Sequence, residues 1–138
     1  MQATRNLRNS LALLVGALAT LPVMAGPYDQ PYSIIQTDKR RSADPDVLPV
    51  LVNRVDDENA RSRPNEAVVA PGPHKVTIDL HGRKGFTATQ HTFDLTTEPC
   101  TRYYVSAKLA NQVTQDWEPI VRSTERIGEC EKKFALAK

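Results

Sequence analysis

The chain has few of the residues that build metal and redox centres: its 138 residues include two cysteines, two methionines and three histidines. Cys100 and Cys130 form no Cys-x-x-Cys pair, which argues against a redox or zinc-binding role for them. The histidines have no ligand spacing within one strand. His81 and His91 could face each other across a turn at residues 82–85, but a zinc site needs three or four protein ligands and we expect no third histidine or cysteine beside this pair. Met1 and Met24 both lie in the first 25 residues, so the rest of the chain lacks thioether ligands for copper. We therefore expect no metal and no cofactor. The histidines are His74, His81 and His91.

Motifs for nucleophilic or calcium-assisted catalysis are also missing from the sequence. It contains no Gly-x-Ser-x-Gly elbow, and Ser106 and Ser123 stand in no recognisable catalytic setting. The carboxylates Asp56, Asp57 and Glu58 lack the alternating oxygen ligands and the glycine of a calcium loop. We therefore predict that the protein is not an enzyme.

No apolar run is long enough to span a membrane. Residues 11–21 are the longest, and they are about half of the roughly 20 residues that a bilayer requires. Arg5 and Arg8 precede this run, and Val23-Met24-Ala25 follows it as a small-x-small cleavage triplet. The pattern predicts a cleavable signal peptide, residues 1–25, and a periplasmic or secreted mature chain. Because no cysteine lies at the cleavage site, we expect no lipid or membrane anchor after cleavage.

An excess of positive charge is missing once this segment is removed. The full chain has 18 basic and 16 acidic residues, and Arg5 and Arg8 belong to the signal segment. The remaining 113 residues of the 138 therefore carry 16 charges of each sign, which gives no reason to expect nucleic acid as a partner. An envelope protein or a glycan remains as the expected partner.

The two cysteines predict one structural disulfide. An exported chain with an even number of cysteines most simply joins them, and the pair would be Cys100–Cys130. Closing a loop of about 30 residues would add about 3–4 kcal/mol to the free energy of unfolding in the chain-entropy model.

The mature chain shows no apolar stripe at helical spacing, but period-2 alternation recurs between turn signals. Val76, Ile78 and Leu80 alternate with polar residues, and turn signals appear every 8–15 residues. This predicts an all-β fold, a small antiparallel β-sandwich of Ig-like or transthyretin-like type. We expect the sandwich over residues 47–138, after a flexible segment over residues 26–46 whose run 32–36 would be an edge strand. In that segment, the basic run 39–41 could be a recognition patch, but Asp38, Asp44 and Asp46 flank it, so we interpret it as a solvated loop face. A short helix is indicated over residues 130–138.

One strand, over residues 102–109, provides the candidate binding surface. Tyr103, Val105, Ala107 and Leu109 should face the core, which leaves Arg102, Tyr104 and Lys108 on the opposite face. An exposed tyrosine between two basic side chains is typical of a binding surface. It is also typical of cross-strand pairing without a ligand, which is the interpretation we favour because single exposed aromatic side chains are common. Trp117 is expected to be a core anchor near the disulfide.

Two segments carry a resemblance to known proteins. Val68-Val-Ala-Pro-Gly-Pro-His-Lys-Val-Thr-Ile78 resembles the turn and strand of PEGA-type surface domains, which are small Ig-like or transthyretin-like modules of exported bacterial proteins. The half from Pro99 to Cys130 resembles small exported proteobacterial proteins of unknown function. The resemblance implies an exported β domain and supplies no catalytic residues.

These observations favour a soluble, non-enzymatic binding or envelope-associated module. The alternative is an inhibitor of a periplasmic or invading hydrolase, of the lysozyme-inhibitor type, because small disulfide-bonded β domains suit that function. A carrier of a small ligand or metal is a third hypothesis, which the shortage of ligands disfavours.

Overall fold

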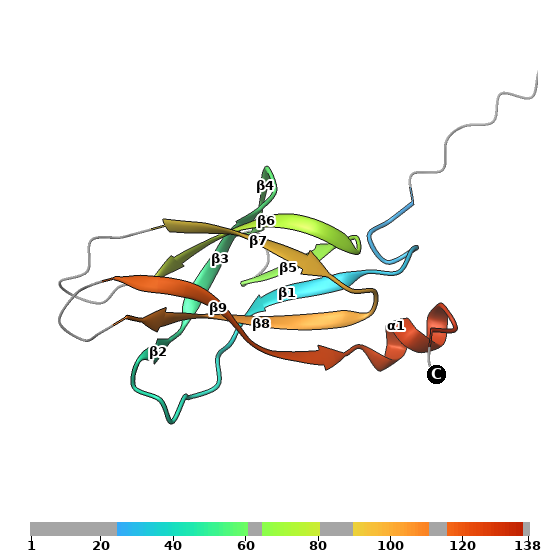
Figure 1. The fold of residues 1–138 in the computed structure, drawn as a ribbon. Coiled ribbons are helices and arrows are strands. Elements are labelled where there is room, and N and C mark those ends of the chain that lie inside the picture. Colours follow the sequence, from blue (N-terminus) through green and yellow to red (C-terminus); the bar gives the residue numbers. More distant parts are fainter. Residues whose placement is uncertain (1–24, 61–64, 81–89, 111–115, 137–138) are drawn as a thin grey trace, which may run out of the picture.

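The computed structural model describes residues 25–60, 65–80, 90–110 and 116–136. Residues 1–24 of the predicted signal segment, the predicted turn at residues 82–85 and His81 lie outside these ranges. Within them, the strands form two sheets packed face to face, which confirms the predicted β-sandwich (Figure 1). No helix in the described ranges is long and apolar enough to cross a bilayer.

The first sheet, called sheet A, is built around β8. The strand β9 pairs with one edge of β8, while β1 and then β2 pair with the other edge, and β5 pairs with the far side of β1. The β1–β8 pair is parallel and the other pairs are antiparallel. The strands are β1 (Ser33–Thr37), β2 (Val47–Leu48), β5 (Glu66–Val69), β8 (Thr101–Leu109) and β9 (Trp117–Arg126).

The second sheet, called sheet B, is antiparallel throughout, with the strand order β4-β3-β6-β7. Its strands are β3 (Val50–Val55), β4 (Glu58–Asn59), β6 (Gly72–Leu80) and β7 (Gln90–Thr97). In β6 and β7, Ile78 lies opposite His91, and the expected pairing of His91 with His81 falls outside the described residues.

The chain passes from sheet A to sheet B at two proline positions. Within residues 47–55, Pro49 separates β2 in sheet A from β3 in sheet B. Proline has no N–H to donate, so a continuous ladder ends there. The predicted Pro-Gly turn at Pro71 and Gly72 makes the second crossing, from β5 to β6, and Gly72 has a φ of +135° that suits glycine.

The core lies between the two sheets and follows the predicted alternation. From sheet A, Val105, Ala107 and Leu109 enter the core, and Val76 and Ile78 enter it from sheet B. Burying each large aliphatic side chain raises the free energy of unfolding by about 1.5–3 kcal/mol relative to leaving that side chain exposed. The inward face of β8 and the all-β class are therefore both confirmed.

The strand β1 corrects the expectation of an edge strand in residues 32–36. It is an internal strand between β8 and β5, and both of its faces are buried. Ile35 faces the core between the sheets, while Ile34 packs with Tyr32 on the opposite face. Partners far away in the sequence cover that second face, so a local pattern could not reveal it.

The disulfide and the short helix α1 (Gly128–Lys133) cover this second face. Cys100 and Cys130 are bonded as predicted, with 5.3 Å between their Cα atoms. They pack with Tyr32 and Ile34 in a small apolar cluster of their own. Trp117 is a core residue but does not lie near the disulfide, because it pairs with Leu109 at the far end of β8.

Candidate functional site

A buried carboxylate organises the outer face of sheet A. Asp38 directly follows β1, and its N–H donates to the carbonyl oxygen of Val105, so it continues the pairing with β8. Its side chain is fully buried. Arg40 reaches both carboxylate oxygens of Asp38, with Nε–Oδ1 at 2.9 Å and Nη2–Oδ2 at 3.1 Å, and its backbone N–H also donates to Oδ1. This two-point geometry is a strong, directional form of ion pair.

Arg122 joins the same carboxylate from β9. The register between β8 and β9 shifts here, because Tyr104 lies opposite Ser123 whereas Val105 lies opposite Val121. Arg122 is the extra residue of this β-bulge, a feature that re-aims a side chain. Its Nη1 donates to Oδ2 of Asp38 at 3.1 Å and to the carbonyl oxygen of Arg40 at 3.2 Å.

The guanidinium of Arg40 lies over the ring of Tyr104. Its central carbon is 4.5 Å from the ring centroid, which is a cation–π distance, and its Nη2 donates to the hydroxyl of Ser123. The Tyr104 hydroxyl donates to Glu125 at 2.6 Å. Asp38, Arg40, Tyr104 and Arg122, which we call the Arg–Tyr cluster, therefore form one connected arrangement.

Two hollows flank Arg40. One, of about 250 Å³, is lined by the cationic side chains of Lys39, Arg40, Arg41 and Arg122 and by a single carboxylate, Asp38. The other, of about 380 Å³, has Tyr104 and Thr37 in its lining, and the buried Thr37 hydroxyl oxygen has no hydrogen-bond partner among the described residues. The first hollow therefore offers a positive environment beside a fixed guanidinium.

Asp38 is held in its ionised form. Burial opposes ionisation and acts to raise the pKa, but the hydrogen bonds from Arg40 and the charges of Arg40 and Arg122 outweigh it. The net effect is a pKa of Asp38 below its ordinary value of 3.8. The carboxylate therefore stays charged at neutral pH and keeps both guanidinium groups in place.

The structure brings two of the three predicted surface residues together. Tyr104 and Arg102 both approach the carboxylate of Glu125, with 3.8 Å for the Arg102 pair. Lys108 lies further along β8, opposite Glu118 in the register, and takes no part in the cluster. Sequence reasoning missed Asp38 and Arg122 and assigned Arg40 to a solvated loop face. The alternating pattern of β8 indicated the outer face of sheet A. It did not indicate the loop after β1 or the bulge in β9, which supply the other residues of the cluster.

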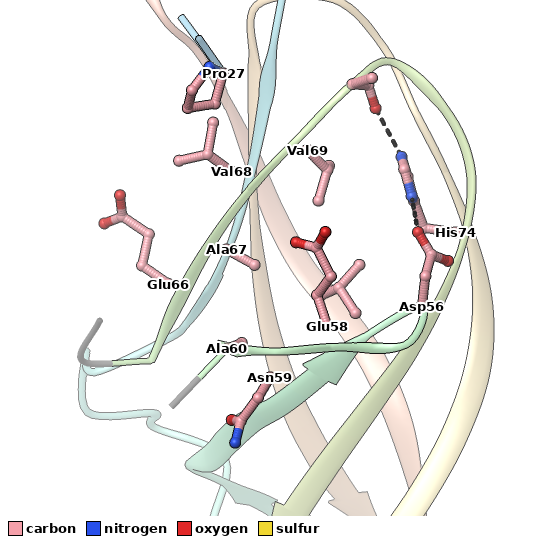
Figure 2. A pocket seen from close by; sticks show the side chains of 12 residues that line it. Pro27, Asp56, Glu58, Asn59, Ala60, Glu66, Ala67, Val68, Val69 and His74 are labelled. Atoms are coloured by element: carbon pink, nitrogen blue, oxygen red, sulfur yellow. Dashed lines mark hydrogen bonds and ion pairs between the residues drawn. The ribbon is translucent and has the colours of Figure 1, made fainter. Parts of the chain in front are cut away.

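A second candidate region is a groove of about 470 Å³ between β5 and the β3–β4 hairpin (Figure 2). His74 closes one end by linking the two walls. Its Nδ1 lies 2.9 Å from Oδ2 of Asp56 in the hairpin, and its Nε2 lies 2.6 Å from the carbonyl oxygen of Ala70 after β5. A carboxylate and a carbonyl oxygen only accept hydrogen bonds, so each ring nitrogen donates to its partner when it carries the proton.

Asp56 is fixed by these contacts. The hydrogen bond from His74, followed by one from the backbone N–H of Lys75, holds the pKa of Asp56 below its ordinary value of 3.8 despite partial burial. Asp56 also adopts a left-handed backbone, with φ of 52°, at the hairpin turn. The His74 link therefore sets the spacing between the sheet A wall and the sheet B wall of the groove.

Neither region contains a recognised chemical centre. Among the described residues, no group of three histidine, cysteine or carboxylate side chains is placed to hold a metal ion. The resemblance to PEGA-type modules stays a prediction. Comparison of the chain with protein-family models, with curated proteins and with solved structures returns no match.

Proposed function

We propose that the mature chain is a non-enzymatic binding module that recognises an acidic partner through the Arg–Tyr cluster. The observation that carries this proposal is the Arg40 guanidinium, which lies over Tyr104 and is tied to the buried Asp38. Arginine and tyrosine dominate the energetics of protein interfaces. Here both side chains are held in place before a partner arrives, which lowers the entropic cost of binding.

The charge of the hollow beside Arg40 favours a carboxylate-bearing partner. Four cationic side chains and one carboxylate line it, and that carboxylate already neutralises part of Arg40 and Arg122. Lys39 and Arg41 are exposed there. A protein surface with Asp or Glu side chains fits better than a neutral glycan, because Arg40 already occupies a face of the Tyr104 ring that a sugar would stack upon.

The proposal includes export of the chain. The sequence pattern of residues 1–25 motivates it, and the Cys100–Cys130 disulfide supports an oxidising compartment. The partner would then be a component of the cell envelope or its surroundings.

Inhibition of a hydrolase is the second candidate function. Glycosidases hold two carboxyl groups in their clefts, and the fixed guanidinium of Arg40 beside a positive hollow is suited to meet such a pair. A lysozyme assay at micromolar protein tests it. Inhibition that Arg41→Gln weakens supports this function, and full lysozyme activity in the presence of the protein counts against it.

The binding surface is tested by titrating ¹⁵N-labelled protein with hexaglutamate. We expect amide shift changes concentrated at residues 38–42, 104–106 and 120–124, and binding that weakens as salt is added. Lys39→Gln with Arg41→Gln removes two charges without touching Asp38 and should weaken binding about tenfold. Lys75→Gln, on sheet B, is the matched control and should change nothing. Shift changes located elsewhere, or equal binding by both variants, would refute the proposal.

A further inference from the structure

The strand β5 has one edge that no other described strand covers. The Thr37 N–H donates to the Asn65 carbonyl oxygen at 2.9 Å, which identifies this residue pair as a hydrogen-bonded pair of the β1–β5 register. Hydrogen-bonded and non-hydrogen-bonded pairs alternate along antiparallel strands. The backbone N–H and C=O groups of Glu66 and Val68 therefore point away from β1, toward the open edge.

The groove runs along this edge, and its opposite wall is the β3–β4 hairpin (Figure 2). Because His74 ties Asp56 in the hairpin to Ala70 at the end of β5, the distance between the walls is set in advance. A volume of about 470 Å³ is within the usual range for ligand-binding clefts. The groove thus combines free backbone groups with a fixed width.

The side chains of the groove are acidic and apolar. Glu58 and Glu66 contribute carboxylates to its lining, and Glu66 also lines the hollow of about 380 Å³ beside Arg40. Ala67, Val68 and Val69 supply small apolar surface, and no lysine or arginine contributes to the described lining, which leaves out residues 61–64. Among the described residues of the lining, the carboxylates of Glu58 and Glu66 therefore give the groove negative charge.

We propose that the open edge of β5 binds an extended polypeptide segment in which basic and small apolar residues alternate, and that this segment adds to sheet A as a further strand. The backbone groups of Glu66 and Val68 would provide the main-chain hydrogen bonds of strand addition, and Glu58 and Glu66 would select basic side chains. The open edge of β5 faces away from β1, although Glu66 lines both this groove and the hollow beside Arg40. The ligand proposed here has the opposite charge to that proposed for the Arg–Tyr cluster.

A second copy of the chain fits the groove less well. Edge-to-edge pairing of two β5 strands would bring the Glu66 carboxylates of both copies, and the neighbouring Glu58 carboxylates, close together. Like charges across a strand pair are destabilising. The carboxylates therefore favour a basic partner segment over self-association.

The test uses a defined probe, the peptide acetyl-TKVKVKT-amide, and the same peptide with glutamate in place of each lysine. Binding to the full mature protein is measured by fluorescence polarisation and mapped by ¹⁵N–¹H spectra. We expect the lysine peptide to bind with shift changes at residues 66–69, and the glutamate peptide to bind at least tenfold more weakly. Equal binding of both peptides, or shift changes away from β5, would overturn the proposal.

Three variants separate strand addition from general charge attraction. Val68→Pro removes an N–H that faces the open edge and leaves the ladder with β1 intact, so it should abolish peptide binding. Glu58→Gln should weaken binding severalfold, and it decides the matter if the proline variant does not fold. Asp94→Asn on β7 is the control and should bind as the wild type does. The proposal would be contradicted by unchanged binding of the peptide to Glu58→Gln or to a folded Val68→Pro. It would also be contradicted if the protein formed a dimer that the lysine peptide dissociates, because a second copy would then be the occupant of the groove.

Discussion

Asp38 and Arg122 meet at 3.1 Å although 84 positions separate them in the sequence. Asp38 directly follows β1, and Arg122 occupies the bulge of β9. Because β1 and β9 pair with the two edges of β8, this contact links the two neighbours of β8. Because Asp38 also binds Arg40, one buried carboxylate determines where two guanidinium groups lie.

Removing this carboxylate should cost more stability than removing an exposed one. We expect Asp38→Ala to lower the free energy of unfolding by about 2–3 kcal/mol, because Arg40 and Arg122 lose their partner but remain partly exposed to solvent. Urea unfolding followed by circular dichroism measures the change. Asp94→Asn breaks an exposed pair with Lys75 and should change the free energy by less than about 0.5 kcal/mol. Equal losses in both variants would show that Asp38 plays no special part.

Acid should destabilise the fold through Asp38 and Asp56. Both have a pKa in the folded state below the ordinary value of 3.8, so the folded state binds their protons less readily than the unfolded state does. Their stabilising contribution is therefore complete above about pH 5 and is lost as the pH falls through the folded-state values. Unfolding free energies measured from pH 7 to pH 2 should fall steeply below about pH 4. The fall should be shallower in Asp38→Asn, and an identical slope in that variant would contradict the assignment.

Breaking the disulfide should release α1 and leave the sandwich folded. Cys100→Ser with Cys130→Ser removes the link that holds α1 over Tyr32 and Ile34, and we expect a loss of about 3–4 kcal/mol. Hydrogen exchange should speed up most in α1 and at the start of β1, while Val76 and Ile78 in the core should speed up only by the factor that the global loss of stability sets. Equal acceleration in α1 and in the core would instead show that the disulfide does not hold α1 against local opening.

Export should leave a mature chain that begins at Gly26. The sequence predicts cleavage after Ala25 and no lipid attachment. Intact-mass measurement of protein recovered from the periplasm or culture medium should give residues 26–138 less two hydrogens for the disulfide. If the protein recovered from these fractions has a mass that includes residues 1–25, the predicted cleavage is wrong.

The period-2 pattern was sufficient to predict the strands whose two faces differ. The alternation in β8 placed Val105, Ala107 and Leu109 in the core and Tyr104 on the outer face, and the structure has them there. The same logic failed for β1, because Ile34 and Ile35 are both buried and α1 covers one of its faces. A pattern within one strand carries no information about an element 90 residues away.

The candidate binding surface was only partly predictable for a similar reason. Residues 39–41 looked like a solvated charge run, and Lys39 and Arg41 are indeed exposed. The role of Arg40 depends on Asp38 being buried and on the β9 bulge that turns Arg122 toward it. Bulges have no reliable sequence signal, so the arrangement emerges only when β8 and β9 are paired in register.

The most direct test of the proposed function is capture of partners from envelope extract by immobilised mature protein, quantified by mass spectrometry. The comparison runs between the wild type, Lys39→Gln with Arg41→Gln, and the control Lys75→Gln. We predict that the wild type and the control retain the same acidic proteins, that these elute with moderate salt, and that the double variant loses them. Retention of one identical set of proteins by all three would contradict recognition through the Arg–Tyr cluster.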